Sequence, residues 1–235
     1  PSPTIRNAAK VVGKFVASFP AITYGPLYYR NLDREKMAAL INKRGNFNRR
    51  MKLSEGGYNE LMWRKRFLEK RNIPRPLAFM CTTVWILSDA SLSGWGGTRL
   101  SDSSHPDAVA YGQWPRTELV SRNINVLELK GALFTLKTLC SDVSNETIDL
   151  KVDNMTTVAA IKKMGSKSKV CDLVAREIWE WAISTNNWLT VSHIAGVDNV
   201  CADRESRRKH KQEIEWGLSQ ECFSWVMKEL KFVPQ

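Results

Sequence analysis

The sequence has few of the residues that cross-link secreted proteins or anchor membrane proteins. Its 235 residues include 5 Cys and 3 His, and the cysteines are far apart, without a C-x-x-C pair. This argues against a disulfide framework or a structural zinc site. No apolar run approaches the ~18 residues of a membrane span, and residues 1–4 lack the pattern of a signal peptide. We therefore expect an intracellular protein with no membrane partner, in either the cytoplasm or the nucleus.

Negative charge is scarce in the first third of the chain. Residues 1–80 carry 17 Lys or Arg against 5 Asp or Glu, whereas residues 81–235 carry 18 against 19. The net charge of +11 therefore resides in the first segment. Such asymmetry favours a densely anionic partner, most often nucleic acid. A membrane surface or a merely solvated basic face are the alternatives.

Residues 1–77 are predicted to form a small basic subdomain of three helices. The first is capped by Thr4 and ends at Pro20, the second covers 27–44, and the third runs from Ser54 to before Pro74. Apolar residues recur at spacings of three and four in each helix. The residues expected to face inward are Ile5, Ala8, Val12, Phe15 and Phe19; Met37, Leu40 and Ile41; and Tyr58, Leu61, Met62 and Leu68.

The pattern changes near residue 80. Strands are predicted at 84–87, 94–98, 108–112, 147–152 and 188–194, and helices at 125–139, 155–163 and 168–185. Strands that come first and then alternate with helices indicate an α/β domain over 80–212, with a mixed sheet flanked by helices. Residues 213–235 read as a helical tail. Most of the tryptophans are expected in the core, namely Trp85, Trp95, Trp114, Trp179, Trp181 and Trp188.

Four acidic residues stand where such a sheet would bring them together. Asp89 follows the first strand, Glu128 lies in the first turn of a helix, Asp153 closes a later strand and Asp203 lies in a short terminal helix. Carboxylates ~5 Å apart repel by about 3 kcal/mol per pair at an effective dielectric of 20, so the cluster must take up protons or cations. Oxygen ligands with little His or Cys nearby favour Mg²⁺ or Mn²⁺ over zinc.

Each acid also has an ordinary structural interpretation. Asp89 could form a turn, and Glu128 could be the third-position partner of an Asn125 helix cap. Asp153 could cap the helix that starts at Met155, and Asp203 could be a solvated helix residue.

The order Asp, Glu, Asp and then His193 ten positions before Asp203 resembles the type I ribonuclease H active site. The surrounding residues resemble the ribonuclease H part of retroelement reverse transcriptases, particularly the DIRS-like group. The segments that carry this resemblance are 88–91, 94–96, 124–130, 152–154 and 193–203. Residues 1–77 resemble the thumb or connection segment that precedes ribonuclease H in that group, notably at 25–30 and 44–47. The resemblance implies a ribonuclease H-like mixed five-stranded sheet.

The resemblance also implies an activity. It implies an endonuclease that hydrolyses the RNA strand of RNA/DNA hybrids with two Mg²⁺ (or Mn²⁺) ions, next to a polymerase domain or subunit outside this chain. The implied metal ligands are Asp89, Glu128, Asp153 and Asp203. His193 would handle a proton or assist product release. Small polar groups suited to reading the RNA 2′-hydroxyl across a minor groove are Ser91, Ser93, Gly94 and Asn154.

The sequence departs from that pattern beside the fourth acid. Arg204 and Glu205 stand where the family has a small and an apolar residue, which adds charge next to Asp203. A catalytically inactive, nucleic-acid-binding module of the same fold is therefore the alternative. A transposase or integrase nuclease of related fold is a further alternative, but such sites end their acidic series in a late Glu, whereas Glu128 comes second here. The paired palm aspartates of a polymerase do not occur.

Overall fold

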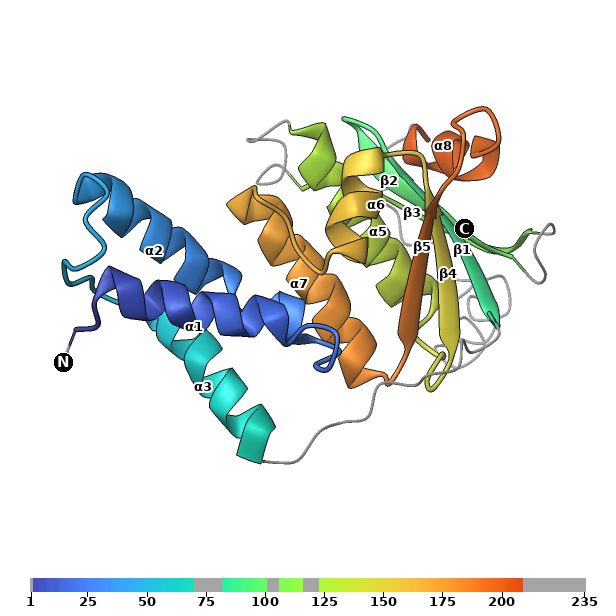
Figure 1. Ribbon diagram of the computed structural model, residues 1–235. Helices are drawn as coiled ribbons and strands as arrows, with labels where there is room; N and C mark the ends of the chain where they lie inside the picture. Colours follow the sequence, from blue (N-terminus) through green and yellow to red (C-terminus); the bar gives the residue numbers. More distant parts are fainter. Residues whose placement is uncertain (1, 70–81, 101–105, 116–122, 209–235) are drawn as a thin grey trace, which may run out of the picture.

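The second part of the chain folds around a five-stranded sheet with the order β3-β2-β1-β4-β5 (Figure 1). The computed structural model describes residues 2–69, 82–100, 106–115 and 123–208. The strands are β1 Val84–Ala90, β2 Gly94–Leu100, β3 Pro106–Gln113, β4 Thr147–Val152 and β5 Trp188–His193. Strands β1, β2 and β3 form an antiparallel meander, whereas β4 pairs in parallel with β1 and with β5. This strand order and direction confirm the predicted ribonuclease H-like fold.

Helices cover both faces of the sheet. The helices are α5 Ile124–Leu139, α6 Met155–Lys162, α7 Lys169–Ser184 and α8 Val200–Ser206. Helices α5, α6 and α7 share one hydrophobic core with β1, β4 and β5, and α8 lies on the opposite face (Figure 1). Two adjacent glycines of β2 allow this close packing. A Cβ on Gly96 would overlap the backbone of α8 at Ser206, and a Cβ on Gly97 would overlap the Thr135 side chain of α5.

The first part of the chain contains three helices and a short 3-10 turn. They are α1 Ile5–Ala17, η1 Gly25–Leu27, α2 Arg30–Asn42 and α3 Glu55–Glu69. The Thr4 hydroxyl accepts from the Asn7 backbone N–H, which confirms the predicted cap of α1. The second helix begins three residues later than predicted because Gly25–Leu27 forms the 3-10 turn. The predicted tail at 213–235 and the predicted end of the third helix at Pro74 lie outside the described residues.

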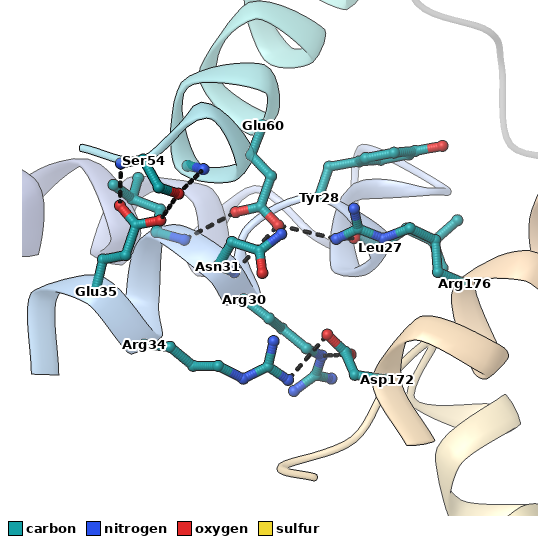
Figure 2. Close-up of polar contacts among 12 residues, drawn as sticks. Leu27, Tyr28, Arg30, Asn31, Arg34, Glu35, Ser54, Glu60, Asp172 and Arg176 are labelled. Carbon is teal, nitrogen blue, oxygen red and sulfur yellow. Dashed lines mark hydrogen bonds and ion pairs between the residues drawn. The ribbon is translucent and has the colours of Figure 1, made fainter. Parts of the chain in front are cut away.

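Helices α2 and α3 cap each other through acidic side chains (Figure 2). Glu60 of α3 accepts from the backbone N–H groups of Asn31 and Leu32, in the first turn of α2, at 3.1 and 2.9 Å. Glu35 of α2 accepts from the backbone N–H and the hydroxyl of Ser54, just before α3. Carboxylates at helix N-termini satisfy unpaired donors and oppose the helix dipole. The charges of these two acids therefore hold the helices together.

Helix α7 joins the first part of the chain to the sheet domain through buried ion pairs (Figure 2). Arg176 Nη2 lies 2.9 Å from Glu60 and donates to the Leu27 carbonyl at 2.7 Å. Asp172 pairs with Arg30 at 3.2 Å and with Arg34 at 2.9 Å. The Leu27 side chain is 1% exposed and belongs to the main core of the sheet domain. The N-terminal helices are therefore docked on α7.

The inward faces predicted for α2 and α3 are confirmed only in part. Leu40 packs against the cluster of Ile5, Ala8 and Met51, and Leu61 and Met62 are half-buried, but the other four predicted residues are exposed. Met37 and Ile41 of α2 are 45% and 72% exposed, and Tyr58 and Leu68 of α3 are 54% and 66% exposed. The buried positions of α3 include the charged Glu60 and Arg64 instead. Arg64 donates to the Gly25 carbonyl and the Ser18 hydroxyl and lies over the rings of Phe15, Phe19 and Trp63. Specific polar partners on neighbouring helices outweigh the local apolar periodicity here.

The other inward predictions are mostly confirmed. In α1, Ile5, Ala8 and Val12 are buried. Trp114 and Trp179 are 5% and 2% exposed. The remaining predicted core tryptophans are half-buried against the hydrophobic clusters; these are Trp85, Trp95, Trp181 and Trp188. Among the described helices, none is long and apolar enough to cross a membrane.

Candidate metal centre

Asp89 lies near the end of β1 and is 4% exposed. Its position inside the strand, paired with Gly96 of β2, excludes the alternative of a turn residue. The buried Ser206 hydroxyl of α8 donates to Asp89 Oδ2. Burial raises the pKa of Asp89 to about 6, the charges of Asp153 and Asp203 add to this rise, and the Ser206 hydrogen bond opposes it. Asp89 is therefore a buried acid that holds its proton more readily than usual.

Glu128 points from the second turn of α5 to the same place. The helix cap is Asn123, whose side chain accepts from the Asn125 N–H, so Glu128 is not the predicted partner of an Asn125 cap. Glu128 is 5% exposed. Burial, followed by the charges of Asp89 and Asp153, raises its pKa to about 9, although a hydrogen bond from the Ala90 backbone opposes the rise. A carboxyl group in this position is expensive to ionise without a cation.

Asp153 completes a group of three acids. It follows β4 directly, and β1 and β4 are parallel with Ser88 opposite Val152, so the next residues, Asp89 and Asp153, emerge at the same edge of the sheet. Asn154, not Asp153, caps α6, because its side chain accepts from the Thr157 N–H at 3.0 Å. Carboxylate oxygens of Asp89, Glu128 and Asp153 all lie within 4.8 Å of one another.

Asp203 lies beside this group but is held by a different partner. Its carboxylate accepts from Arg207 Nε at 2.7 Å, one helical turn further along α8. The Asp203 side chain is 41% exposed, yet its charge contributes to the raised pKa of Asp89. The structure thus brings three predicted ligands into one cluster and places the fourth near it in an ion pair.

The negative charge of Glu205, which follows Asp203 by two residues, is balanced by neighbouring arginines. Glu205 is 6% exposed and pairs with Arg204 at 3.0 Å and with Arg208 at 3.2 Å. The guanidinium of Arg208 also lies 4.4 Å above the Tyr111 ring of β3. The departure from the family pattern therefore leaves the helix packed on the sheet, with Ser206 in contact with Asp89.

His193 lies at the end of β5 and is exposed. Its Nε2 is 3.1 Å from the backbone carbonyl oxygen of Asp153, so the ring N–H can donate to that oxygen. The imidazole therefore contacts the backbone of Asp153, but it is not one of the three side chains that could together hold a metal ion.

The predicted substrate-binding residues have structural partners. The Ser91 hydroxyl donates to the Ser206 carbonyl at 2.7 Å and accepts from the N–H groups of Ser93 and Gly94. Gly94 is buried, and a Cβ there would overlap the Gly112 carbonyl of β3. The exposed Ser93 hydroxyl lies 2.8 Å from the Ser91 hydroxyl, so of these four residues only the half-buried Asn154 lies outside this turn.

Asn154 contacts Asn125, a residue near the acids that was not predicted as a site candidate. Its amide donates to the Asn125 side-chain oxygen at 3.1 Å, which joins the starts of α5 and α6 beside the acids. Ser206 and Arg207 were also missed. No local pattern marks them, since their importance depends on α8 folding back onto β1 and β2.

The donor set fits a hard divalent cation. Within the described residues, no Lys or Arg forms an ion pair with Asp89, Glu128 or Asp153. A cation bound to these oxygens would replace protons on the two acids with raised pKa and remove the mutual repulsion. All three candidate ligand atoms are carboxylate oxygens, which suit Mg²⁺, Mn²⁺ or Ca²⁺.

Comparisons with solved structures give distant likenesses. Ribonuclease H1 of Halobacterium salinarum is similar over 52% of this chain and 91% of its own, with 12% identity and a TM-score of 0.42. LC11-RNase H1, solved with an RNA/DNA hybrid, is similar over 52% of this chain and 92% of its own, with 16% identity and a TM-score of 0.45. The foamy viral protease-reverse transcriptase, solved with double-stranded DNA, matches 83% of this chain and 35% of its own, with 12% identity and a TM-score of 0.31.

Comparisons of sequence add no relative. No protein-family model matches the chain, and no curated protein matches it. The fold is therefore assigned from the order and direction of the five strands.

Proposed function

We propose that this protein is a divalent-metal-dependent endonuclease that hydrolyses the RNA strand of RNA/DNA hybrids. The observation that carries the proposal is the convergence of Asp89, Glu128 and Asp153, from three separate elements, within 4.8 Å. Asp89 and Glu128, the two most buried of these acids, form no ion pair with a described Lys or Arg, and burial raises the pKa of both. Strongly perturbed titratable groups concentrate at functional sites, so the cluster is the best candidate for a reaction centre.

Each residue of the site would have a separate role in this reaction. Asp89, Glu128 and Asp153 would hold the cation, with Asp203 completing the shell of a second ion. When bound, a pair of Mg²⁺ or Mn²⁺ ions activates water and stabilises the departing oxygen of a phosphodiester. Ser206 keeps Asp89 oriented through its hydroxyl. His193, whose Nε2 lies 3.1 Å from the Asp153 backbone oxygen, would take or deliver a proton during the reaction.

The hybrid as substrate and the retroelement origin are supported by the sequence resemblance. The resemblance to the ribonuclease H part of a DIRS-like reverse transcriptase extends over the acidic motifs and the N-terminal helices, and it implies a polymerase domain or subunit as partner. A physical feature agrees with a polyanionic substrate. The docked N-terminal part carries the surplus positive charge, which suits contacts to backbone phosphates.

The test is cleavage of an end-labelled RNA/DNA hybrid in Mg²⁺. Asp153→Asn should reduce the rate by about a hundredfold or more, since even outer-shell partners of metal sites cost 10- to 100-fold. The matched control is Asp149→Asn on the same strand, where the carboxylate accepts from Thr190 and is not part of the cluster. This variant should cleave at the wild-type rate, and duplex DNA should stay intact. Equal cleavage by wild type and Asp153→Asn, or none by either, would contradict the proposal.

One observation favours the alternative of an inactive nucleic-acid-binding module. The Asp203 carboxylate is already paired with Arg207, so the fourth ligand is engaged. In that case the wild-type chain would bind the hybrid with an affinity that falls steeply with salt, but would leave the RNA strand uncut with either Mg²⁺ or Mn²⁺.

A further inference from the structure

Arg207, at the end of α8, is the arginine of this segment that pairs with Asp203. Its Nε lies 2.7 Å from Asp203 Oδ1, and the interaction spans one helical turn. Its positive charge also interacts with Asp89 and Asp153. The guanidinium is therefore close enough to the acidic cluster to supply part of the charge that a cation would bring.

The neighbouring arginines have other partners. Arg204 pairs with Glu205, and Arg208 pairs with the same carboxylate and lies over the Tyr111 ring. The Arg204 side chain is 71% exposed and that of Arg207 is 68% exposed. Arg204 in α8 and Arg207 at its C-cap thus have similar exposure but neutralise different acids.

The backbone that carries Asp203 is fixed, whereas the Arg207 side chain is not. Ser206 is 2% exposed, its hydroxyl contacts both Asp89 and the Asp203 carbonyl oxygen, and its own carbonyl accepts from Ser91. The helix cannot shift without breaking these bonds. Release of the Asp203 carboxylate therefore requires only that a long, mostly exposed arginine side chain rotate toward solvent.

We propose that Arg207 is a built-in counterion that holds Asp203 in the metal-free protein and yields this carboxylate to a divalent cation. The inference rests on the proposed function, because the cation is the one assigned to the acidic cluster. It implies two unequal binding steps. The first ion binds Asp89, Glu128 and Asp153, and the second binds more weakly because Arg207 must leave Asp203.

Titration of the full chain with Mn²⁺, with free Mn²⁺ followed by electron paramagnetic resonance, tests this. Exposed ion pairs contribute little, so Arg207→Gln should tighten the second step by about two- to fivefold. Arg204→Gln is the matched control and should bind as wild type does. Arg207→Lys keeps the charge and should bind no more tightly than wild type. In an Asp203→Asn background, Arg207→Gln should have no effect on the second step.

The outcomes separate the two proposals. If wild type binds Mn²⁺ but Arg207→Gln leaves the second step unchanged, or if Arg204→Gln tightens it equally, the counterion role is wrong and the proposed function stands. If wild type binds no Mn²⁺, the proposed function fails and the counterion role fails with it. Arg207→Gln should unfold cooperatively in EDTA, at a melting temperature no more than about 4 °C below that of wild type because it loses one exposed ion pair, and this shows that the comparison is between folded proteins.

Discussion

Two pairs of buried acids in this protein have the same burial and opposite surroundings. Glu60 and Asp172 are 1% and 4% exposed, and each pairs with arginine across the junction with α7. Asp89 and Glu128 are 4% and 5% exposed and have no such partner among the described residues. Burial of a carboxylate alone therefore does not indicate a reaction centre. The presence or absence of a fixed cation distinguishes an acid that holds the fold together from one prepared to bind a ligand.

The largest expected effect comes from breaking a compensated pair. Arg176→Ala should lower the free energy of unfolding by about 3 kcal/mol, because it leaves Glu60 buried with only the start of α2 to balance its charge. Urea denaturation measures this. Lys137→Ala, in an exposed pair with Glu177 on the neighbouring helices, is the control and should cost below about 0.5 kcal/mol. Equal losses in the two variants would remove the distinction between the pairs.

A somewhat smaller effect is expected from the uncompensated Glu128. Its pKa of about 9 exceeds the ordinary value of 4.5, so the folded state holds a proton that the unfolded state releases. Its stabilising contribution is complete below pH 4.5 and is lost as the pH rises toward 9. In EDTA the stability of wild type should fall by about 2.5 kcal/mol between pH 6.5 and 8.5, at 1.36 kcal/mol per pH unit.

The control for this pH dependence is Glu128→Gln, which has no proton to lose. Its stability in EDTA should change far less over the same range. A parallel decline in both proteins would show that Glu128 does not titrate in this window.

The smallest of the three effects concerns Asp89. Its pKa of about 6 means that at pH 7.5 the metal-free protein pays for an ionised, buried carboxylate. Asp89→Asn should therefore raise the stability in EDTA by about 1–2 kcal/mol, while it abolishes cation binding. Thermal unfolding with and without Mg²⁺ checks both the higher stability in EDTA and the loss of cation binding. A lower melting temperature of the variant in EDTA would instead identify Asp89 as a structural residue.

The order of elements and the acidic cluster could be predicted from the sequence because both have local signals. Period-two and period-3.6 patterns located the strands and helices to within a few residues, and strand ends located Asp89 and Asp153. The start of α5 was predicted one residue late, at 125 instead of Ile124, and its cap was placed at Asn125 instead of Asn123 because the two asparagines are equivalent as caps in the sequence. That shift led to the mistaken capping alternative for Glu128.

The compensated acids could not be predicted in the same way. Glu60 and Arg176 are 116 positions apart, and neither stands in a pattern that indicates burial. Their burial depends on the packing of α3 against α7, which no local pattern in the sequence predicts. The same packing affects which apolar residues of α2 and α3 face solvent. Met37, Ile41, Tyr58 and Leu68 were therefore wrongly predicted to face inward.

The insertion of Leu27 into the main core has a consequence for any shortened version of this chain. A protein truncated to begin near residue 80 would lose Leu27 and the partly buried Tyr24 and Tyr28 from this core and expose Asp172 and Arg176 to water, where both are readily hydrated. It would keep the rest of its own core. Within residues 2–69, the N-terminal helices released alone would keep one small hydrophobic cluster around Ile5, Ala8 and Met51 and the polar contacts between α2 and α3. The N-terminal helices therefore depend on the sheet domain for their structure more than the sheet domain depends on them.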